Sequence, residues 1–149
     1  PYWEPDARGA ILGIKRSTKK EHIVRATLES IAFQSDDLIK AMEKDLGRKI
    51  TDLKVDGCAS LNNFLMQNQA DISDIHIVRH KSIESTSLGA AYLAGLASGY
   101  YKSIEDIIEI KDIDKEFYPA IEGEERQRAK AKWHRAVEAV LALAEDEVF

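Results

Sequence analysis

The sequence predicts an α/β domain in which helices flank a mixed or largely parallel sheet. Long segments carry apolar residues at helical spacing, short β-branched segments lie between them, and glycines close two of the expected helices. Alternation of strands and helices along a chain is typical of layered α/β domains. In such sheets ligands bind beyond the carboxyl ends of the strands, so a functional site is expected there.

The first third of the chain predicts a strand and then a long helix. Residues 9–14 form an apolar run with two glycines, which we interpret as a strand. Thr18 and Glu21 have the spacing of a capping box, and Gly47 is placed to end the helix. Side chains at steps of four and three predict the buried stripe of this helix: Val24, Leu28, Ile31, Ser35, Leu38 and Met42.

The rest of the chain predicts shorter elements before a final long helix. Strands are expected at 50–55 and 75–78, and a short helix from Asn62 or Asn63 to Ile72. A helix rich in glycine and alanine at 85–98 is either a closely packed core helix or the wall of a ligand site. Further elements are expected as a helix at 103–110 capped by Ser103, a break at 117–119, and a helix from about Glu124 with Ala129, Trp133, Ala136, Val140 and Leu143 on one face.

Length, net charge and cysteine count indicate which classes of protein this chain can belong to. A chain of 149 residues is expected to form one domain, 1–149, that buries roughly 70% of its unfolded surface. The net charge of −5 argues against a broad surface for nucleic acid or anionic membrane, and no apolar run approaches the roughly 20 residues of a membrane span. We recognise no signal peptide, and the single cysteine favours a reducing compartment, the cytoplasm. Because the chain begins at Pro1, we expect it to be a fragment of a longer protein.

The segment DGCASLNN, residues 56–63, is the main candidate site. It joins an expected strand to an expected helix, and its small side chains leave the backbone accessible. A helix N-terminus favours a phosphate, and an asparagine there can either cap the helix or bind a base or ribose. An ordinary turn with an asparagine cap explains the same residues. Cys58 could be an activated thiolate, although a small packing residue is the simpler interpretation.

Other chemistry finds little support in the sequence. The four histidines, His22, His76, His80 and His134, form no HExxH or Cys/His set, so a metal site is not expected. His22 is expected in the first turn of a helix. The acidic residues 122–125 are interpreted as charge at the start of the last helix. No arrangement resembles a catalytic triad.

Several stretches resemble the FGGY carbohydrate kinases. Residues 9–14, followed after seven residues by HIVRATLE, are similar to the second signature of that family. ATLESIAFQ, NNFLMQNQADI and SLGAAYLAGLASGYY resemble the branch that phosphorylates glycerol more than the xylulose or gluconate kinases. The resemblance extends from Pro1 to about Ala144.

The resemblance implies one lobe of a two-lobed enzyme with the actin-like ATPase, or ribonuclease H-like, fold. ATP with Mg²⁺ would bind between the lobes, and its γ-phosphoryl group would pass to a glycerol hydroxyl. The catalytic and glycerol-binding residues would lie upstream of this chain, and the full-length enzyme would be a homo-oligomer. On this chain, the resemblance implies nucleotide contacts at Gly57, Cys58 and Asn62.

One position departs from the family pattern. The family usually has Asp-Gly-Gly where this chain has Asp56, Gly57 and Cys58. A side chain at the second glycine would cost about 1 kcal/mol or more if that residue needed a positive φ. Two alternatives accompany the interpretation as a kinase of the glycerol-phosphorylating branch. One is another FGGY kinase, of the xylulose or gluconate type, and the other is a nucleotide-binding regulatory module without catalysis.

Overall fold

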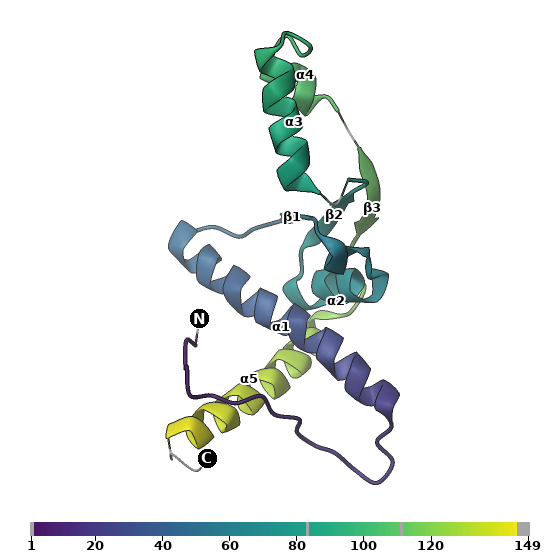
Figure 1. Cartoon of the computed structure of the whole chain (residues 1–149). Helices are drawn as coiled ribbons and strands as arrows, with labels where there is room; N and C mark the ends of the chain where they lie inside the picture. Colours follow the sequence, from purple (N-terminus) through teal and green to yellow (C-terminus); the bar gives the residue numbers. More distant parts are fainter. Residues whose placement is uncertain (1, 83, 111, 146–149) are drawn as a thin grey trace.

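A mixed α/β arrangement is present in the computed structural model, which describes residues 2–82, 84–110 and 112–145 (Figure 1). A three-stranded sheet lies against one short helix, and two long helices cross beside it (Figure 1). The elements in chain order are α1 (Lys20–Leu46), β1 (Asp52–Val55), the 3₁₀ turn η1 (Cys58–Leu61), α2 (Asn63–Ser73), β2 (His76–His80), α3 (Ser85–Ala97), α4 (Ile104–Ile108), β3 (Ile113–Phe117) and α5 (Gly123–Glu145).

The sheet has the order β1-β2-β3. β1 and β2 are parallel, with Leu53 opposite Ile77, and β3 is antiparallel to β2, with Phe117 opposite Ile77. The expected mixed sheet is therefore confirmed. Strand β3 was not predicted, because an exposed strand with Asp, Lys and Glu in succession offers little of the apolar alternation by which strands are recognised.

The core lies between the sheet, α1 and α2. Its buried members come from four elements and the turn before β2, and they are Ala32, Ile39, Leu65, Met66, Ala70, Ile75, Ile77 and Phe117. Burial of each large aliphatic side chain contributes about 1.5–3 kcal/mol. This packing holds the sheet against α1 and α2 and therefore determines where the turn between β1 and α2 lies.

The long helix α1 is confirmed, but its expected capping box is wrong. The N-cap residue is Lys19, and its backbone N–H donates to Nδ1 of His22 over 3.1 Å. The Thr18 hydroxyl instead accepts from the N–H of Lys15 over 2.9 Å, one residue before the N-cap position. His22 lies in the first turn as expected, and Gly47 ends the helix with a φ of 66°.

The predicted buried stripe of α1 is also wrong. Val24, Ile31, Leu38 and Met42 are between 42% and 60% exposed. The residues that face the core are instead Ala32, Asp36 and Ile39. These residues lie one position along from members of the predicted stripe, which turns the buried face by about 100°. The position of α2 and α5 decides which face is covered.

The strand predicted at 9–14 is absent. These residues are not assigned to any helix or strand, and Ile11, Leu12 and Ile14 are exposed. A strand forms only when a neighbour completes its backbone hydrogen bonds, and no described strand lies beside this segment.

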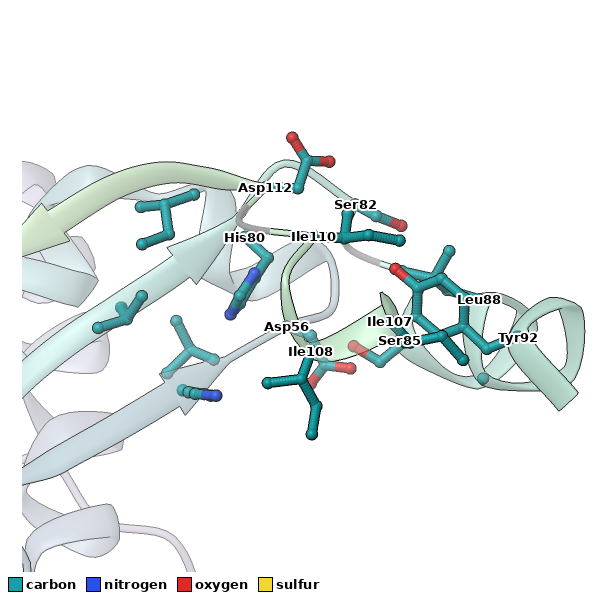
Figure 2. A pocket seen from close by; sticks show the side chains of 15 residues that line it. Asp56, His80, Ser82, Ser85, Leu88, Tyr92, Ile107, Ile108, Ile110 and Asp112 are labelled. Carbon is teal, nitrogen blue, oxygen red and sulfur yellow. The ribbon is translucent and has the colours of Figure 1, made fainter. Parts of the chain in front are cut away.

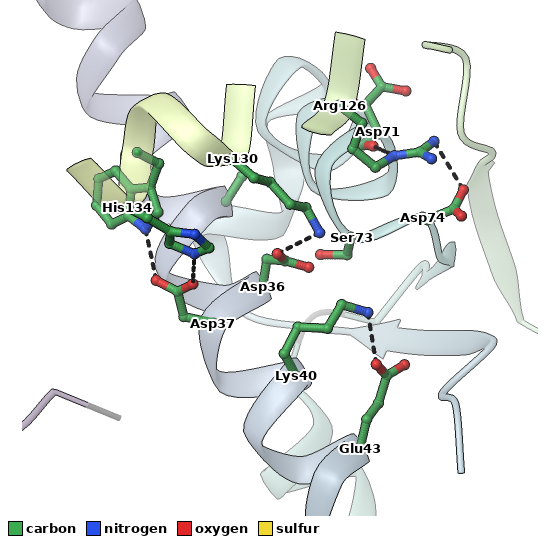
Figure 3. Close-up of polar contacts among 12 residues, drawn as sticks. Asp36, Asp37, Lys40, Glu43, Asp71, Ser73, Asp74, Arg126, Lys130 and His134 are labelled. Atoms are coloured by element: carbon green, nitrogen blue, oxygen red, sulfur yellow. Dashed lines mark hydrogen bonds and ion pairs between the residues drawn. The ribbon is translucent and has the colours of Figure 1, made fainter. Parts of the chain in front are cut away.

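Helix α5 is held across α1 by polar side chains (Figure 3). Lys130 forms an ion pair of 2.7 Å with the buried carboxylate of Asp36. Asp37 accepts from the indole N–H of Trp133 over 2.7 Å and lies 3.1 Å from Nε2 of His134. The predicted inner face of α5 is half-buried as far as Val140, while Leu143 is exposed.

Helices α3 and α4 project away from the rest of the molecule and are called the arm here (Figure 1). Both were predicted, and the Ser103 hydroxyl accepts from the Asp106 N–H as the expected cap of α4. The interpretation of α3 as a core helix is wrong, since none of its residues is fully buried. Gly95 has a local role, because a Cβ there would lie 2.6 Å from the Tyr101 ring.

Throughout the described ranges, no helix combines the length and the apolar content that a bilayer span requires.

Candidate functional site

The candidate loop, residues 57–63, leaves the carboxyl end of β1 and enters α2. Gly57 has φ 80° and ψ 165°, a conformation that other residues rarely adopt. Its carbonyl accepts from both the N–H and the hydroxyl of Ser60, over 3.1 and 2.7 Å. A Cβ built on Gly57 would meet open space. The glycine is therefore required by the backbone conformation and not by close packing.

Asn62 caps α2. Its Oδ1 accepts from the Leu65 N–H over 3.1 Å, and this contact assigns the orientation of the amide. The side chain is exposed, and among the described residues no acceptor is recorded for its NH₂ group. The cap and a ligand contact are therefore compatible, because they use different atoms of one amide.

Cys58 fits the loop without backbone strain. Within the described part of the chain, the non-glycine residues with a positive φ are Trp3 and Asp74, so Cys58 is not among them. Its thiol is exposed on the first residue of η1. The cost expected from a Cβ in the left-handed region therefore does not arise.

Arg79 is a member of this region that the sequence analysis missed. It lies on β2, is 6% exposed, and its Nη1 donates to the Ser60 carbonyl over 2.6 Å and to Asn63 Oδ1 over 3.0 Å. Its Nε and Nη2 each lie 2.7 Å from Asp114 Oδ2 on β3. The signal that could have identified it is an arginine directly after the expected strand at 75–78, where a charged residue is rarely buried without a partner.

A hollow of about 730 Å³ opens beyond the carboxyl ends of β1 and β2 (Figure 2). The arm forms its other wall through Ser85, Leu88, Tyr92 and Ile107, and the labelled side chain of Asp56 lies between the two walls. Ligands of α/β proteins bind in such positions. The hollow and the candidate loop therefore adjoin through Asp56 and Gly57.

The structure brings the predicted nucleotide residues together on one turn. Gly57, Cys58 and Asn62 all lie on the stretch between β1 and α2, and Cys58 and Asn62 are exposed. None of the three lines the hollow itself, which reaches only their neighbour Asp56. A ligand that uses both features would extend from the hollow across the loop.

The shifted pKa values of the sheet lie at its other end. The Thr51 hydroxyl, and next the imidazole of His76, lower the pKa of Asp52 at the amino end of β1. His76 stacks on Tyr118 with ring centroids 4.3 Å apart. Among the described residues, no three His, Cys, Asp or Glu side chains gather in a way that could hold a metal ion.

Comparison with known proteins identifies similar chains. The family model of the C-terminal domain of the FGGY family of carbohydrate kinases matches residues 1–98. A glycerol kinase of Malacoplasma penetrans is 54% identical over 137 residues, which cover 92% of this chain and 27% of that protein. This chain therefore spans less than a third of the length of that relative.

Solved structures agree with this result. The crystal structure of Plasmodium falciparum glycerol kinase with ADP matches with a TM-score of 0.87 and 36% identity, over 95% of this chain and 28% of that one. Gluconate kinase from Lactobacillus acidophilus matches with a TM-score of 0.71 and 28% identity, over 97% and 29% of the two chains. Both the backbone and the sequence are more similar to the first of these structures.

Proposed function

This chain belongs to the FGGY family of carbohydrate kinases, and from that premise we propose that it is the nucleotide-side lobe of an ATP-dependent glycerol kinase. The intact enzyme would convert glycerol and ATP to glycerol 3-phosphate and ADP. Residues 1–149 would form its C-terminal domain, with the actin-like fold of the family. The observation that carries the proposal is 54% identity to a glycerol kinase across 92% of this chain.

The geometry of the loop supports a nucleotide contact. Gly57, Cys58 and Asn62 present an accessible backbone, a small side chain and an amide NH₂ on one turn. Behind them, the N-terminus of α2 supplies a partial positive charge that favours an anion. The ADP in the P. falciparum structure, a chain with a TM-score of 0.87, supports the same type of ligand here.

The remaining parts of the reaction would be supplied outside this chain. We assign no catalytic residue to it, and the general base and the glycerol site would belong to the other lobe. Magnesium would accompany ATP through its phosphates, and no step of the proposal uses a metal ion held by the described residues. Catalysis of phosphoryl transfer by the whole enzyme would depend on positioning and charge stabilisation.

The setting of the enzyme is part of the same proposal. We infer that the full-length protein is a homo-oligomer that works in the cytoplasm without nucleic-acid partners. The single cysteine supports a reducing compartment, and the net charge of −5 argues against nucleic-acid partners. The homo-oligomer is what the family resemblance implies.

The test of the site replaces Asn62 in the full-length protein. Asn62→Leu removes both the helix cap and the proposed ligand donor, whereas Asn62→Ser retains a capping side chain and loses only the NH₂ group. Both variants should raise the KM for ATP by about 5- to 150-fold, equivalent to one or two lost hydrogen bonds. The KM for glycerol should change far less, because its site would lie in the other lobe.

Two results would contradict this assignment. An unchanged ATP dependence in Asn62→Leu would make the loop a structural turn. A KM for ATP that rises in Asn62→Leu but not in Asn62→Ser would mean that the change comes entirely from loss of the helix cap.

The acceptor is tested by a direct comparison of substrates. Full-length protein with Mg·ATP should phosphorylate glycerol in preference to xylulose and gluconate. A preference for xylulose or gluconate over glycerol would assign this chain to another branch of the family. ADP binding without turnover on any of them would support the alternative of a regulatory module.

A further inference from the structure

We propose that Arg79 is a positioning residue that holds the 57–63 loop in its nucleotide-binding geometry. This inference rests on the proposed function, because it assigns a role within the same site. Arg79 is 19 residues from Ser60 in the sequence and lies on a different strand from the one that leads into the loop. It would act on the nucleotide only through the loop.

The contacts of Arg79 tie the end of η1 to the start of α2. A single nitrogen, Nη1, donates to the Ser60 carbonyl over 2.6 Å and to Asn63 Oδ1 over 3.0 Å. These two acceptors lie on either side of Asn62, the residue with the exposed amide. The guanidinium therefore determines where the Asn62 backbone lies, although its hydrogen bonds to the loop go to the two neighbours and not to the Asn62 side chain.

The other side of the guanidinium is fixed by β3. Nε and Nη2 both lie 2.7 Å from Asp114 Oδ2, and the group stands over the Phe117 ring at 5.5 Å from its centroid. Phe117 is itself a buried member of the core. The loop is thus attached to the antiparallel strand through Arg79, in addition to its covalent attachment to β1 and α2.

Burial makes this arrangement specific to arginine. At 6% exposure, an unpaired charge at position 79 would be costly, so its partners must remain in place while the protein is folded. The planar guanidinium presents donors in fixed directions, which lets one side chain satisfy Asp114 and the loop together. A lysine ammonium could pair with Asp114 but could not reproduce the same fixed geometry toward both loop acceptors.

Arg126 provides a matched control. It is also a buried arginine, at 9% exposure, and it pairs with an aspartate, Asp74, over 2.9 Å. Its remaining donors contact the carbonyls of Asp71 and Ile121, at the end of α2 that is remote from the loop. Loss of either arginine should destabilise the fold, but only loss of Arg79 should disturb the loop.

The experiment measures ADP affinity and Cys58 reactivity in the full-length protein. Arg79→Gln should weaken ADP binding on the order of 10-fold, equivalent to the loss of about one hydrogen bond to the nucleotide. Arg79→Lys should give an intermediate Kd, and neither variant should alter the KM for glycerol more than about twofold. Arg126→Gln should lower the thermal midpoint but keep the wild-type Kd for ADP.

The exposed thiol of Cys58 reports on the loop directly. Alkylation by iodoacetamide, followed by peptide mass mapping, should be faster at Cys58 in Arg79→Gln than in the wild type and unchanged in Arg126→Gln. ADP should slow the reaction in the wild type. A residue that only stabilised the fold would change the thermal midpoint without a selective change in these two measurements.

The outcomes separate this inference from the proposed function. A wild-type protein that binds no ADP would contradict the proposed function itself. A wild-type protein that binds ADP while Arg79→Gln binds it equally well would overturn the positioning role alone. If Arg79→Gln does not fold, Arg79→Lys decides: a Kd at least about threefold weaker than wild type supports the inference, and an unchanged Kd overturns it.

Discussion

The packed half of the molecule and the arm differ in a way that composition does not predict. The packed half consists of α1, α2, α5 and the sheet, and it contains all the described residues of the hydrophobic core. The arm contains α3, which is built mainly from alanine, glycine and leucine, yet no residue of α3 is fully buried. Apolar content allows a helix to be buried, but burial requires a surface that packs against it.

The same contrast exists on opposite sides of α1. Its buried face carries the small Ala32 and the charged Asp36, while Val24, Ile31, Leu38 and Met42 are exposed on another face. Asp36 is tolerated inside because Lys130 of α5 pairs with it over 2.7 Å (Figure 3). The packing partner therefore selects the face of the helix, and an ion pair compensates a residue that hydrophobicity alone would exclude.

The largest effect should follow from a cavity in the packed half. Ile77 is fully buried between β1 and β3 on the central strand. Ile77→Ala should lower the free energy of unfolding by about 2–5 kcal/mol, and Ile77→Val by about 0.5–1.5 kcal/mol. Urea denaturation of this chain measures both values. A loss below 1 kcal/mol for Ile77→Ala would mean that the sheet is not the centre of the core.

A smaller, pH-dependent effect is expected where α1 meets the start of β1. The Lys40 ammonium, and next the Ile50 N–H, lower the pKa of Glu43. A carboxyl whose folded pKa is depressed stabilises the fold above its unfolded pKa of about 4.3, and this contribution is lost as the pH falls through the folded value. Glu43→Gln should therefore cost about 1 kcal/mol at most near neutral pH.

Thermal denaturation of the wild type and Glu43→Gln between pH 7 and pH 3 measures this dependence. The difference between their midpoints should shrink as the pH falls. A difference that stays constant over this range would assign the effect of the substitution to packing.

The smallest effect is expected in the arm. Leu93 on α3 is 70% exposed, so Leu93→Ser should change the free energy of unfolding of this chain by only about 0.5 kcal/mol. The same urea denaturation as for Ile77→Ala gives the comparison. A loss similar to that of Ile77→Ala would show that the arm is packed in solution, and the contrast between the two regions would disappear.

Local patterns predicted most of the elements and much of the candidate site. The glycine and asparagine of the loop act locally: Gly57 provides a positive φ, and Asn62 caps the helix that follows it. Such properties depend on a few consecutive residues, so they can be predicted from the chain alone. The same holds for Gly47 at the end of α1 and Ser103 at the start of α4.

Tertiary structure decided the features that depend on distant residues. The failed strand at 9–14, the missed β3 and the turned face of α1 all depend on which neighbour is present to pair or pack. Arg79 shows the same limit at the site, because its partners Ser60, Asn63 and Asp114 come from two other parts of the chain. By itself the sequence determined the helices, the ends at Gly47 and Ser103 and the turn at Gly57, since backbone conformation and capping are local. Only the folded chain determined which faces are buried and what holds the loop, because burial and ion pairing are properties of the surfaces that meet.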